Sequence, residues 1–180
     1  MTTPPASRYT RTAIALHWLL GVAIVGSFSV GVYMSDLSMS PLRLKLYNWH
    51  KWAGITILAL SALRLLWRIT HQPPPDVPMP AWQQRAAHLT HIALYAPFFA
   101  VPLAGWAYSS AAGFPVVVYG VLPLPDFVSP DKALAALLKS LHQALAFSLG
   151  LLVLVHIGAA LKHQLIDRDG LLSRMWMKST

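Results

Sequence analysis

One uncharged stretch, residues 141–161 (LHQALAFSLGLLVLVHIGAAL), constrains the fold of this chain more than any other part of it. A helix needs about 20 mostly apolar residues to cross the hydrocarbon of a bilayer. This stretch is that long and contains no Lys, Arg, Asp or Glu. It nevertheless carries His142 and His156, and an ionisable group inside a span is costly enough to require a functional reason. The stretch therefore predicts a transmembrane helix whose two histidines have a functional role.

The two histidines of this helix share one face. Their separation of fourteen residues (156 − 142) brings the second ring to within about 40° of the first. At about 1.5 Å per residue the two rings lie roughly 21 Å apart along the axis, near opposite sides of the membrane. This arrangement suits a support for two stacked metal centres, each of which needs a partner ligand from elsewhere in the chain.

The composition indicates that most of the chain is embedded in a membrane. Of the 180 residues 56% are hydrophobic and 11% charged, whereas soluble domains are about 25% charged. There is no cysteine, which excludes disulfides, iron–sulfur clusters, c-type haem attachment and thiolate zinc sites. We predict one all-α domain over residues 1–180, a four-helix transmembrane bundle with spans at about 12–34, 44–67, 86–108 and 138–163. Residues 109–135 are predicted to form a long apolar loop against the membrane surface.

The net charge of +8 indicates topology and lipid contact before nucleic acid. Of the 14 Lys and Arg residues, nine fall on the side that holds both termini and five on the other. This excess predicts that both termini are cytoplasmic. The inner group is Arg8, Arg11, Arg64, Arg68, Arg85, Lys162, Arg168, Arg174 and Lys178, and the outer group is Arg43, Lys45, Lys51, Lys132 and Lys139.

The predicted topology sorts four histidines into two levels. His50 and His142 fall on the outer half of their spans, and His17 and His156 fall on the inner half. Two neutral imidazoles from different helices can ligate a haem iron from opposite sides. The core of the bundle is therefore predicted to hold two haem sites, one in each leaflet.

A flat macrocycle beside its ligand helix needs small side chains one turn from the ligand. Each of the four histidines is followed at i+4 by a small residue, whereas His88 and His91 are followed by Ile92 and Tyr95. Glycine inside a helix costs about 1 kcal/mol relative to alanine, so it often marks a close approach. Small residues also serve ordinary helix packing in membranes. Those at i+4 are Gly21, Gly54, Ala146 and Ala160.

Other interpretations of the histidines remain open. Each could be a polar group that is hydrogen-bonded inside the bundle. A zinc or copper transporter would need acidic or sulfur ligands beside the histidines, and no Asp lies within a span. Arg64 lies at the inner level, where it could neutralise a propionate of the inner haem or extend towards the cytoplasmic head groups.

Several segments together resemble the bacterial cytochrome b561 family of small di-haem membrane cytochromes. The resemblance covers essentially the whole chain. The matching segments are RYTRTAIALHW, WHKWAGITILALSALRLLWR, AHLTHIALY, PLAGW, LHQALA and HIGAALKHQLIDRDGLLSRM.

The resemblance implies two haem b groups, with His17 and His156 as ligands of the inner iron and His50 and His142 as ligands of the outer iron. His88 and His91 correspond to non-ligand histidines that could serve quinone or proton traffic. The resemblance further implies an oxidoreductase that takes electrons from superoxide, or another small donor outside the membrane, and passes them to ubiquinone. Related proteins are anchor subunits of hydrogenases and dehydrogenases, so an electron-transfer subunit of a larger complex is the alternative.

Overall fold

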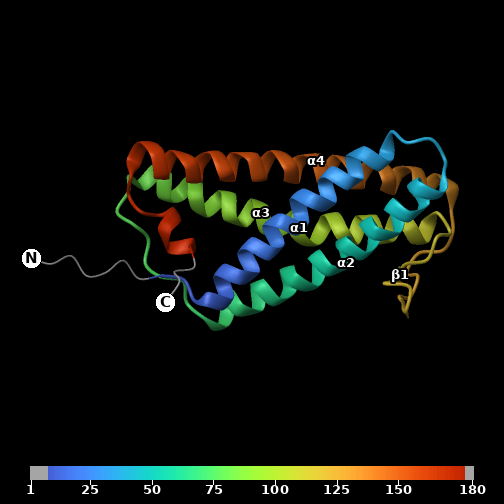
Figure 1. The fold of residues 1–180 in the computed structure, drawn as a ribbon, viewed down its shortest axis with the longest axis horizontal. Coiled ribbons are helices and arrows are strands. Elements are labelled where there is room, and N and C mark those ends of the chain that lie inside the picture. The colour runs from blue at the N-terminus through green and yellow to red at the C-terminus, as the bar shows by residue number, and fades with distance from the viewer. Residues whose placement is uncertain (1–7, 177–180) are drawn as a thin grey trace, which may run out of the picture.

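The computed structural model describes residues 8–176, so Lys178 of the predicted inner charges lies outside the described residues. Four long helices dominate the chain (Figure 1): α1 (Arg11–Ser35), α2 (Pro41–Thr70), α3 (Ala81–Ala111) and α4 (Lys132–Lys162). Each is long and apolar enough to cross a membrane. The protein is an all-α four-helix transmembrane bundle, as the apolar runs predict.

Polar residues set where three of the helices begin. The side chains of Thr10, Ser40 and Asp131 accept hydrogen bonds from backbone N–H groups three residues later. Such caps satisfy donors that the first helical turn leaves unpaired. The fourth start, at Ala81, follows Pro80 and has no side-chain cap. The helix boundaries fix where each predicted ligand histidine lies along its helix.

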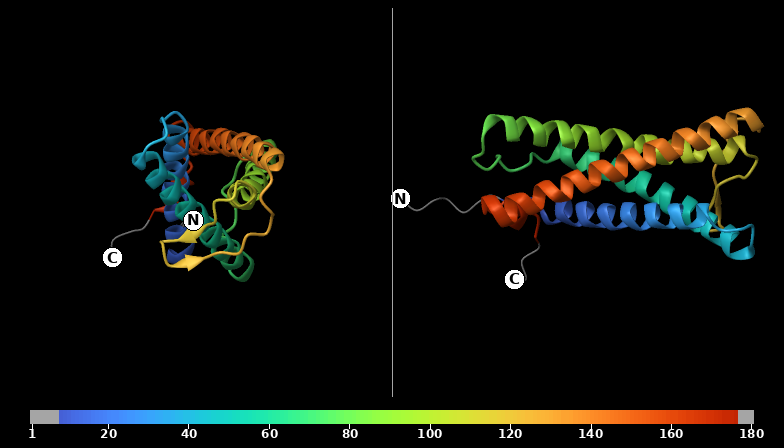
Figure 2. Two further views of the ribbon diagram at one scale, coloured as in Figure 1. Left: turned by 90° about the vertical axis from the view of Figure 1, so that its right-hand side faces the viewer. Right: turned by 90° about the horizontal axis from the view of Figure 1, so that it is seen from above.

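The helices pack as two antiparallel pairs. α1 packs mainly against α2, and α3 packs mainly against α4, while α2 and α3 make the main contact between the pairs and α1 touches α4 only slightly. The end-on view in Figure 2 shows the four helices around the bundle axis. Both predicted histidine sites combine one ligand from the first pair with one from α4, so they lie where the two pairs face each other.

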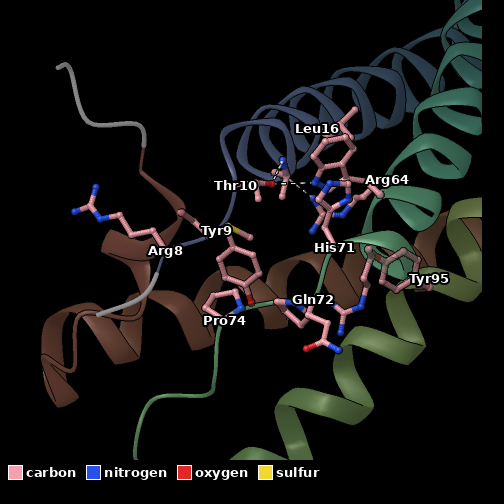
Figure 3. Close-up of a pocket in the computed structure, with 14 residues that line it drawn as sticks. Arg8, Tyr9, Thr10, Leu16, Arg64, His71, Gln72, Pro74 and Tyr95 are labelled. Atoms are coloured by element: carbon pink, nitrogen blue, oxygen red, sulfur yellow. Dashed lines mark hydrogen bonds between the residues drawn. The ribbon is translucent and has the colours of Figure 1, made fainter. Parts of the chain in front are cut away.

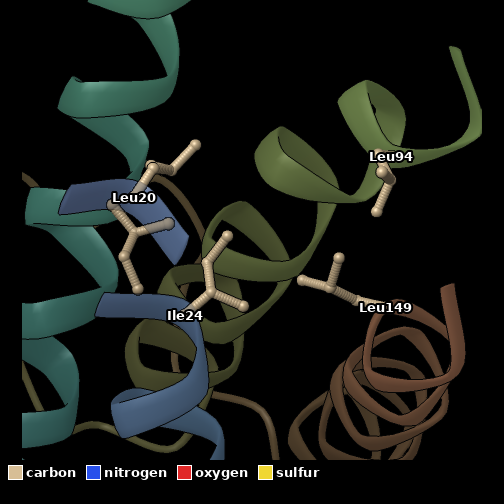
Figure 4. Close-up of a cluster of buried hydrophobic side chains, with 5 residues drawn as sticks. Leu20, Ile24, Leu94 and Leu149 are labelled. Carbon is tan, nitrogen blue, oxygen red and sulfur yellow. The ribbon is translucent and has the colours of Figure 1, made fainter. Parts of the chain in front are cut away.

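A small apolar cluster joins all four helices between the two histidine levels (Figure 4). Its buried members from α1 follow His17, the member from α2 follows His50, and the member from α4 lies between His142 and His156. The cluster therefore places an apolar layer between the two levels. It consists of Leu20, Ile24, Ile57, Leu94 and Leu149.

The region predicted as one long loop is more ordered than the sequence indicates. α3 continues to Ala111, and a two-stranded antiparallel hairpin follows, with β1 (Val117–Val118) paired to β2 (Leu122–Pro123). The turn residues Tyr119 and Gly120 have φ values of 52° and 73°. Positive φ at consecutive turn residues matches the right-handed twist of a hairpin, and glycine adopts it without steric cost.

The chain after α4 folds back onto the inner end of the bundle. A π-helical turn, η1 (His163–Asp167), and a 3₁₀ turn, η2 (Leu172–Met175), form this C-terminal segment. It is held to α1 by the Trp18 Nε1–H, which donates to the Met175 carbonyl at 2.8 Å. It is held to the proline-rich linker by Arg174, whose Nη2 donates to the Pro75 carbonyl at 2.7 Å. The inner end is therefore partly covered by the chain's own terminus.

Candidate functional site

The structure brings the four predicted ligand histidines together in two pairs. The ring centres of His50 and His142 are 6.0 Å apart at the outer level. Those of His17 and His156 are also 6.0 Å apart, at the inner level. An imidazole nitrogen lies about 2 Å from a metal that it ligates, so two rings on opposite sides of one metal have centres roughly 6 Å apart. Both pairs have the separation that bis-imidazole ligation needs.

At the outer level, α1 holds the ring of His50. Its Nδ1 lies 3.1 Å from the Ser27 carbonyl and 3.2 Å from the Ser27 hydroxyl. A Cβ atom at Gly31 would lie only 3.1 Å from Cε1 of the same ring. The ring of His50 therefore occupies the space that a side chain at position 31 would fill.

α3 holds the ring of His142 in the same way. Its Nδ1 lies 3.0 Å from the Val101 carbonyl. A Cβ atom at Gly105 would lie 2.9 Å from Cε1 and 3.0 Å from Nδ1 of the ring. Separations this short do not occur for real side chains, so the position requires glycine while His142 keeps this rotamer.

The two outer contacts share one geometry. In each, the accepting carbonyl lies four residues before the glycine, at Ser27–Gly31 and Val101–Gly105. A helical side chain lies over the turn before its own Cα, so any larger residue would cover that carbonyl. Because a carbonyl can only accept, the proton of each ring is on Nδ1, which leaves Nε2 free to bind a metal.

The inner level contains a third imidazole. The ring centre of His91, on α3, lies 5.8 Å from that of His156, as close as that of His17. His88, one turn earlier on α3, is exposed. Within residues 8–176, no protein hydrogen bond to the rings of His17, His156 or His91 is found. Of the two predicted quinone or proton-path residues, the structure places only His91 at the site.

The two predicted glycines leave open space beside their ligands. A Cβ atom at Gly21 or at Gly54 would meet no heavy atom within 4 Å. Each glycine lies one turn after its histidine, on the helix face from which the ring projects. A flat macrocycle lying along these faces needs this clearance, so the residues fit haem at both levels.

A solvent-open pocket lies at the inner end of the bundle (Figure 3). Arg8, Arg64 and Arg68 supply three positive charges to its wall, and no Asp lines it. The Nη1 group of Arg64 donates to the Ala13 carbonyl on α1 at 3.4 Å, so the guanidinium is partly buried and lies against α1. The apolar and aromatic part of the wall is formed by Tyr9, Ala13, Leu16, Trp67, Tyr95 and Met175.

An ionic cluster fixes the C-terminal segment beside this pocket. The Nδ1 of His163 donates to the Asp169 carboxylate at 2.5 Å, and Asp167 accepts from Lys162 at 2.5 Å. Partial burial acts to raise the pKa of the Asp169 carboxyl, but hydrogen bonds from the Leu171 N–H and from His163 outweigh it. The pKa of Asp169 is consequently below its ordinary value, and the carboxylate is ionised at neutral pH.

Sequence reasoning missed the residues that hold the outer rings. A search at i+4 examines only the helix that carries the ligand, whereas Ser27, Gly31, Val101 and Gly105 lie on neighbouring helices. Of these, only Val101 and Gly105 lie near a segment noted in the sequence, PLAGW. Nothing in the sequence pairs Gly31 with His50.

Comparisons with known proteins agree with this geometry. A family described as Prokaryotic cytochrome b561 matches residues 8–178. The chain is similar to cytochrome b561 homolog 2 of Escherichia coli (strain K12), with 35% identity over 96% of this chain and 93% of that protein. It is similar to cytochrome b561 homolog 1 of the same organism, with 37% identity over 94% and 97% of the two chains. A probable superoxide oxidase, CybB, of Yersinia pestis is 28% identical over 95% of this chain and 97% of that protein.

These matches cover nearly the full length of both partners, and they agree with the resemblance seen in the sequence. Four helices long and apolar enough to span a membrane, with paired histidines between them, suit a membrane-bound haem protein of electron transport. The chain belongs to the prokaryotic cytochrome b561 family, and it is a multi-pass bacterial membrane protein that binds haem b and transfers electrons.

Proposed function

We propose that this chain is a di-haem cytochrome that carries electrons across the bacterial inner membrane, from a small donor outside to ubiquinone. His50 and His142 ligate the outer iron, and His17 and His156 ligate the inner iron. The single observation that carries the proposal is the repeated pair spacing: both pairs have ring centres 6.0 Å apart, and both share α4. Each bound haem supplies a one-electron iron couple.

Superoxide is the donor that we propose, because a relative of nearly the same length is named a probable superoxide oxidase. Superoxide gives up one electron to become oxygen, and ubiquinone takes two electrons and two protons to become ubiquinol. The balanced reaction consumes two superoxide anions, one ubiquinone and two protons, and it yields two oxygen molecules and one ubiquinol. The outer side has five basic residues by our topology, and such a surface attracts an anion.

The pocket at the inner end is the quinone site that we propose. Its aromatic and apolar wall suits a quinone ring and the start of its isoprenoid tail, and Arg64 offers a donor to a quinone oxygen. His91, which faces His156, is the residue that we propose passes protons towards the pocket. Both termini are cytoplasmic in this proposal, so the protons come from the cytoplasm.

The deciding experiment combines haem counting with a quinone assay. The purified chain in lipid vesicles should contain two haems per chain by reduced-minus-oxidised absorbance spectra. It should also reduce ubiquinone when superoxide is generated outside. One haem per chain, or two haems without quinone reduction, would overturn the proposal. Quinone reduction that appears only with a co-purified dehydrogenase subunit would instead support the anchor-subunit alternative.

A further inference from the structure

The loop between α3 and α4 contains a segment that the proposed electron path does not use. Residues 113–125 (GFPVVVYGVLPLP), which we call the outer hairpin segment, contain no charged residue. Figures 1 and 2 show that its strands lie to one side of the bundle, at the end where α3 finishes and α4 begins.

Hydrogen bonds fix the depth of the segment along α2. The Trp52 Nε1–H donates to the Val117 carbonyl at 2.7 Å, and the hydroxyls of Thr56 and Tyr119 are 2.7 Å apart. Thr56 lies fifteen residues after Pro41, which is about 22 Å along a helix at 1.5 Å per residue. The hairpin therefore folds back along the side of α2, beside residues of the spanning helix.

Most of the strong polar groups of the segment are satisfied inside the protein. Lys51 donates to the carbonyls of Phe114 and Pro115, at 3.5 Å and 3.1 Å. The Leu124 N–H donates to the Val116 carbonyl at 2.9 Å. Three of the thirteen residues of 113–125 are prolines, which have no N–H to satisfy. Backbone can lie at membrane depth when its polar groups are satisfied in this way.

Several large apolar side chains of the segment are exposed. Val121, at the tip, is 83% exposed, and three neighbours from the same segment are also exposed. Exposed apolar residues gathered in one segment mark an interaction surface. The aromatic pair Trp52 and Tyr119, with ring centres 5.6 Å apart, borders these residues, and Trp and Tyr concentrate where lipid head groups meet hydrocarbon. The exposed neighbours are Phe114, Tyr119 and Leu122.

We propose that the outer hairpin segment inserts into the outer leaflet of the bilayer, where it lies against α2. The occupant of the apolar surface is lipid because the segment continues the lipid-facing side of a spanning helix and carries no charge of its own. A hydrophilic partner protein would be expected to meet polar or charged groups there. The proposal rests only on the membrane location of the bundle, and not on the donor or on quinone.

The absence of cysteine from the chain makes a direct test possible. Val121→Cys and Leu122→Cys, each labelled with a nitroxide, report the surroundings of the tip in vesicles of phosphatidylethanolamine and phosphatidylglycerol. Met39→Cys, 74% exposed in the turn between α1 and α2 at the same end, is the aqueous control. Leu154→Cys, 68% exposed on α4, is the lipid control. The unlabelled haem spectrum of each variant serves as the check on folding.

Accessibility to oxygen, which concentrates in lipid, is compared with accessibility to a water-soluble nickel complex. We expect both hairpin labels to be more accessible to oxygen than to the nickel complex. Their ratio of oxygen to nickel accessibility should be closer to that of Leu154→Cys than to that of Met39→Cys. A ratio equal to that of Met39→Cys would place the hairpin in water and overturn the proposal. Low accessibility to both reagents would place protein over the hairpin, either a second copy or a partner, and would also overturn it.

Discussion

At the outer end of the bundle each histidine ring is held by a backbone carbonyl of a neighbouring helix and lies against a glycine of that helix. At the inner end, His17 and His156 have no such carbonyl within the described residues, although their ring centres are the same 6.0 Å apart. A third imidazole and a pocket with three arginines occupy that end instead. The spacing of the two pairs is equal, whereas their surroundings differ.

The difference indicates that the outer and inner sites have different roles. At the outer site, contacts with neighbouring helices fix the orientation of each ring and keep its Nε2 directed inwards. The outer site is therefore organised before haem binds. The inner rings lack this support, and their orientation depends more on the haem itself. A less constrained inner site near an open pocket suits the end of the bundle where, in our proposal, ubiquinone binds and leaves and protons enter. The apolar cluster between the levels keeps the two environments separate.

Removal of a ligand histidine should have the largest effect. His142→Ala should lower the haem content from two per chain to one. Superoxide-driven quinone reduction should fall by more than about 100-fold, since loss of a supporting residue alone costs about 10–100-fold. His156→Ala should also leave one haem. Its spectrum should differ from that of His142→Ala, because the outer haem is retained in His156→Ala and the inner haem in His142→Ala. His88→Ala, at an exposed position on α3, is the matched control. Two haems in either ligand variant would refute the assignment.

The third imidazole provides the next test of the inner site. His91→Ala should keep both haems, because its ring is an additional neighbour and not a ligand in our assignment. Quinone reduction should fall by about 100-fold, the low end of the effect of losing an acid–base group. Added imidazole should restore part of the rate. Loss of the inner haem in His91→Ala, together with its retention in His17→Ala, would exchange the roles of these two residues.

The outer site can be tested through a glycine that does not touch the metal. In Gly105→Ala the new Cβ would lie 2.9 Å from the His142 ring, so the ring or α3 must move. We expect the outer haem to bind about 10-fold more weakly, the low end for a residue that supports a ligand, while the inner haem is retained. Gly26→Ala, whose Cβ would meet nothing within 4 Å, is the control. Equal haem affinity in the two variants would show that the glycine contact has no role in holding His142.

The sequence predicted the elements that depend on one helix at a time. The apolar spans follow from composition, and the fourteen-residue spacing of His142 and His156 follows from helix geometry alone. The clearance beside Gly21 was likewise visible, because it is a property of the helix that carries His17.

Features that depend on two helices could not be predicted. The contact of Gly31 with His50 requires the rotation of α1 relative to α2, which no local pattern specifies. The approach of His91 to His156 similarly requires the packing of α3 on α4. The hairpin was missed for another reason, since strands of two residues are too short for an alternating pattern.

The smallest effect that we predict concerns the C-terminal segment beside the inner pocket. The pKa of the Asp169 carboxyl is lowered in the folded protein, so its ionisation contributes stability above its unfolded pKa of about 3.9, and that stability is lost as the pH falls through the lower folded value. Asp169→Asn should therefore destabilise the docked segment at pH 7 by about 1 kcal/mol, the scale of one hydrogen bond.

The docked position of this segment also includes the hydrogen bond from the Trp18 Nε1–H to the Met175 carbonyl. Undocking therefore exposes the backbone of the segment, which hydrogen exchange can measure. Hydrogen exchange of residues 170–176 at pH 7 should be faster in Asp169→Asn than in the unmodified chain, and the difference should shrink as the pH is lowered below 4. Haem content should stay at two, because the segment contributes no ligand. Met175→Ala keeps the backbone carbonyl that Trp18 uses, so it serves as the control. A difference in exchange that grows on acidification would mean that the ionised Asp169 carboxylate does not hold the segment in place.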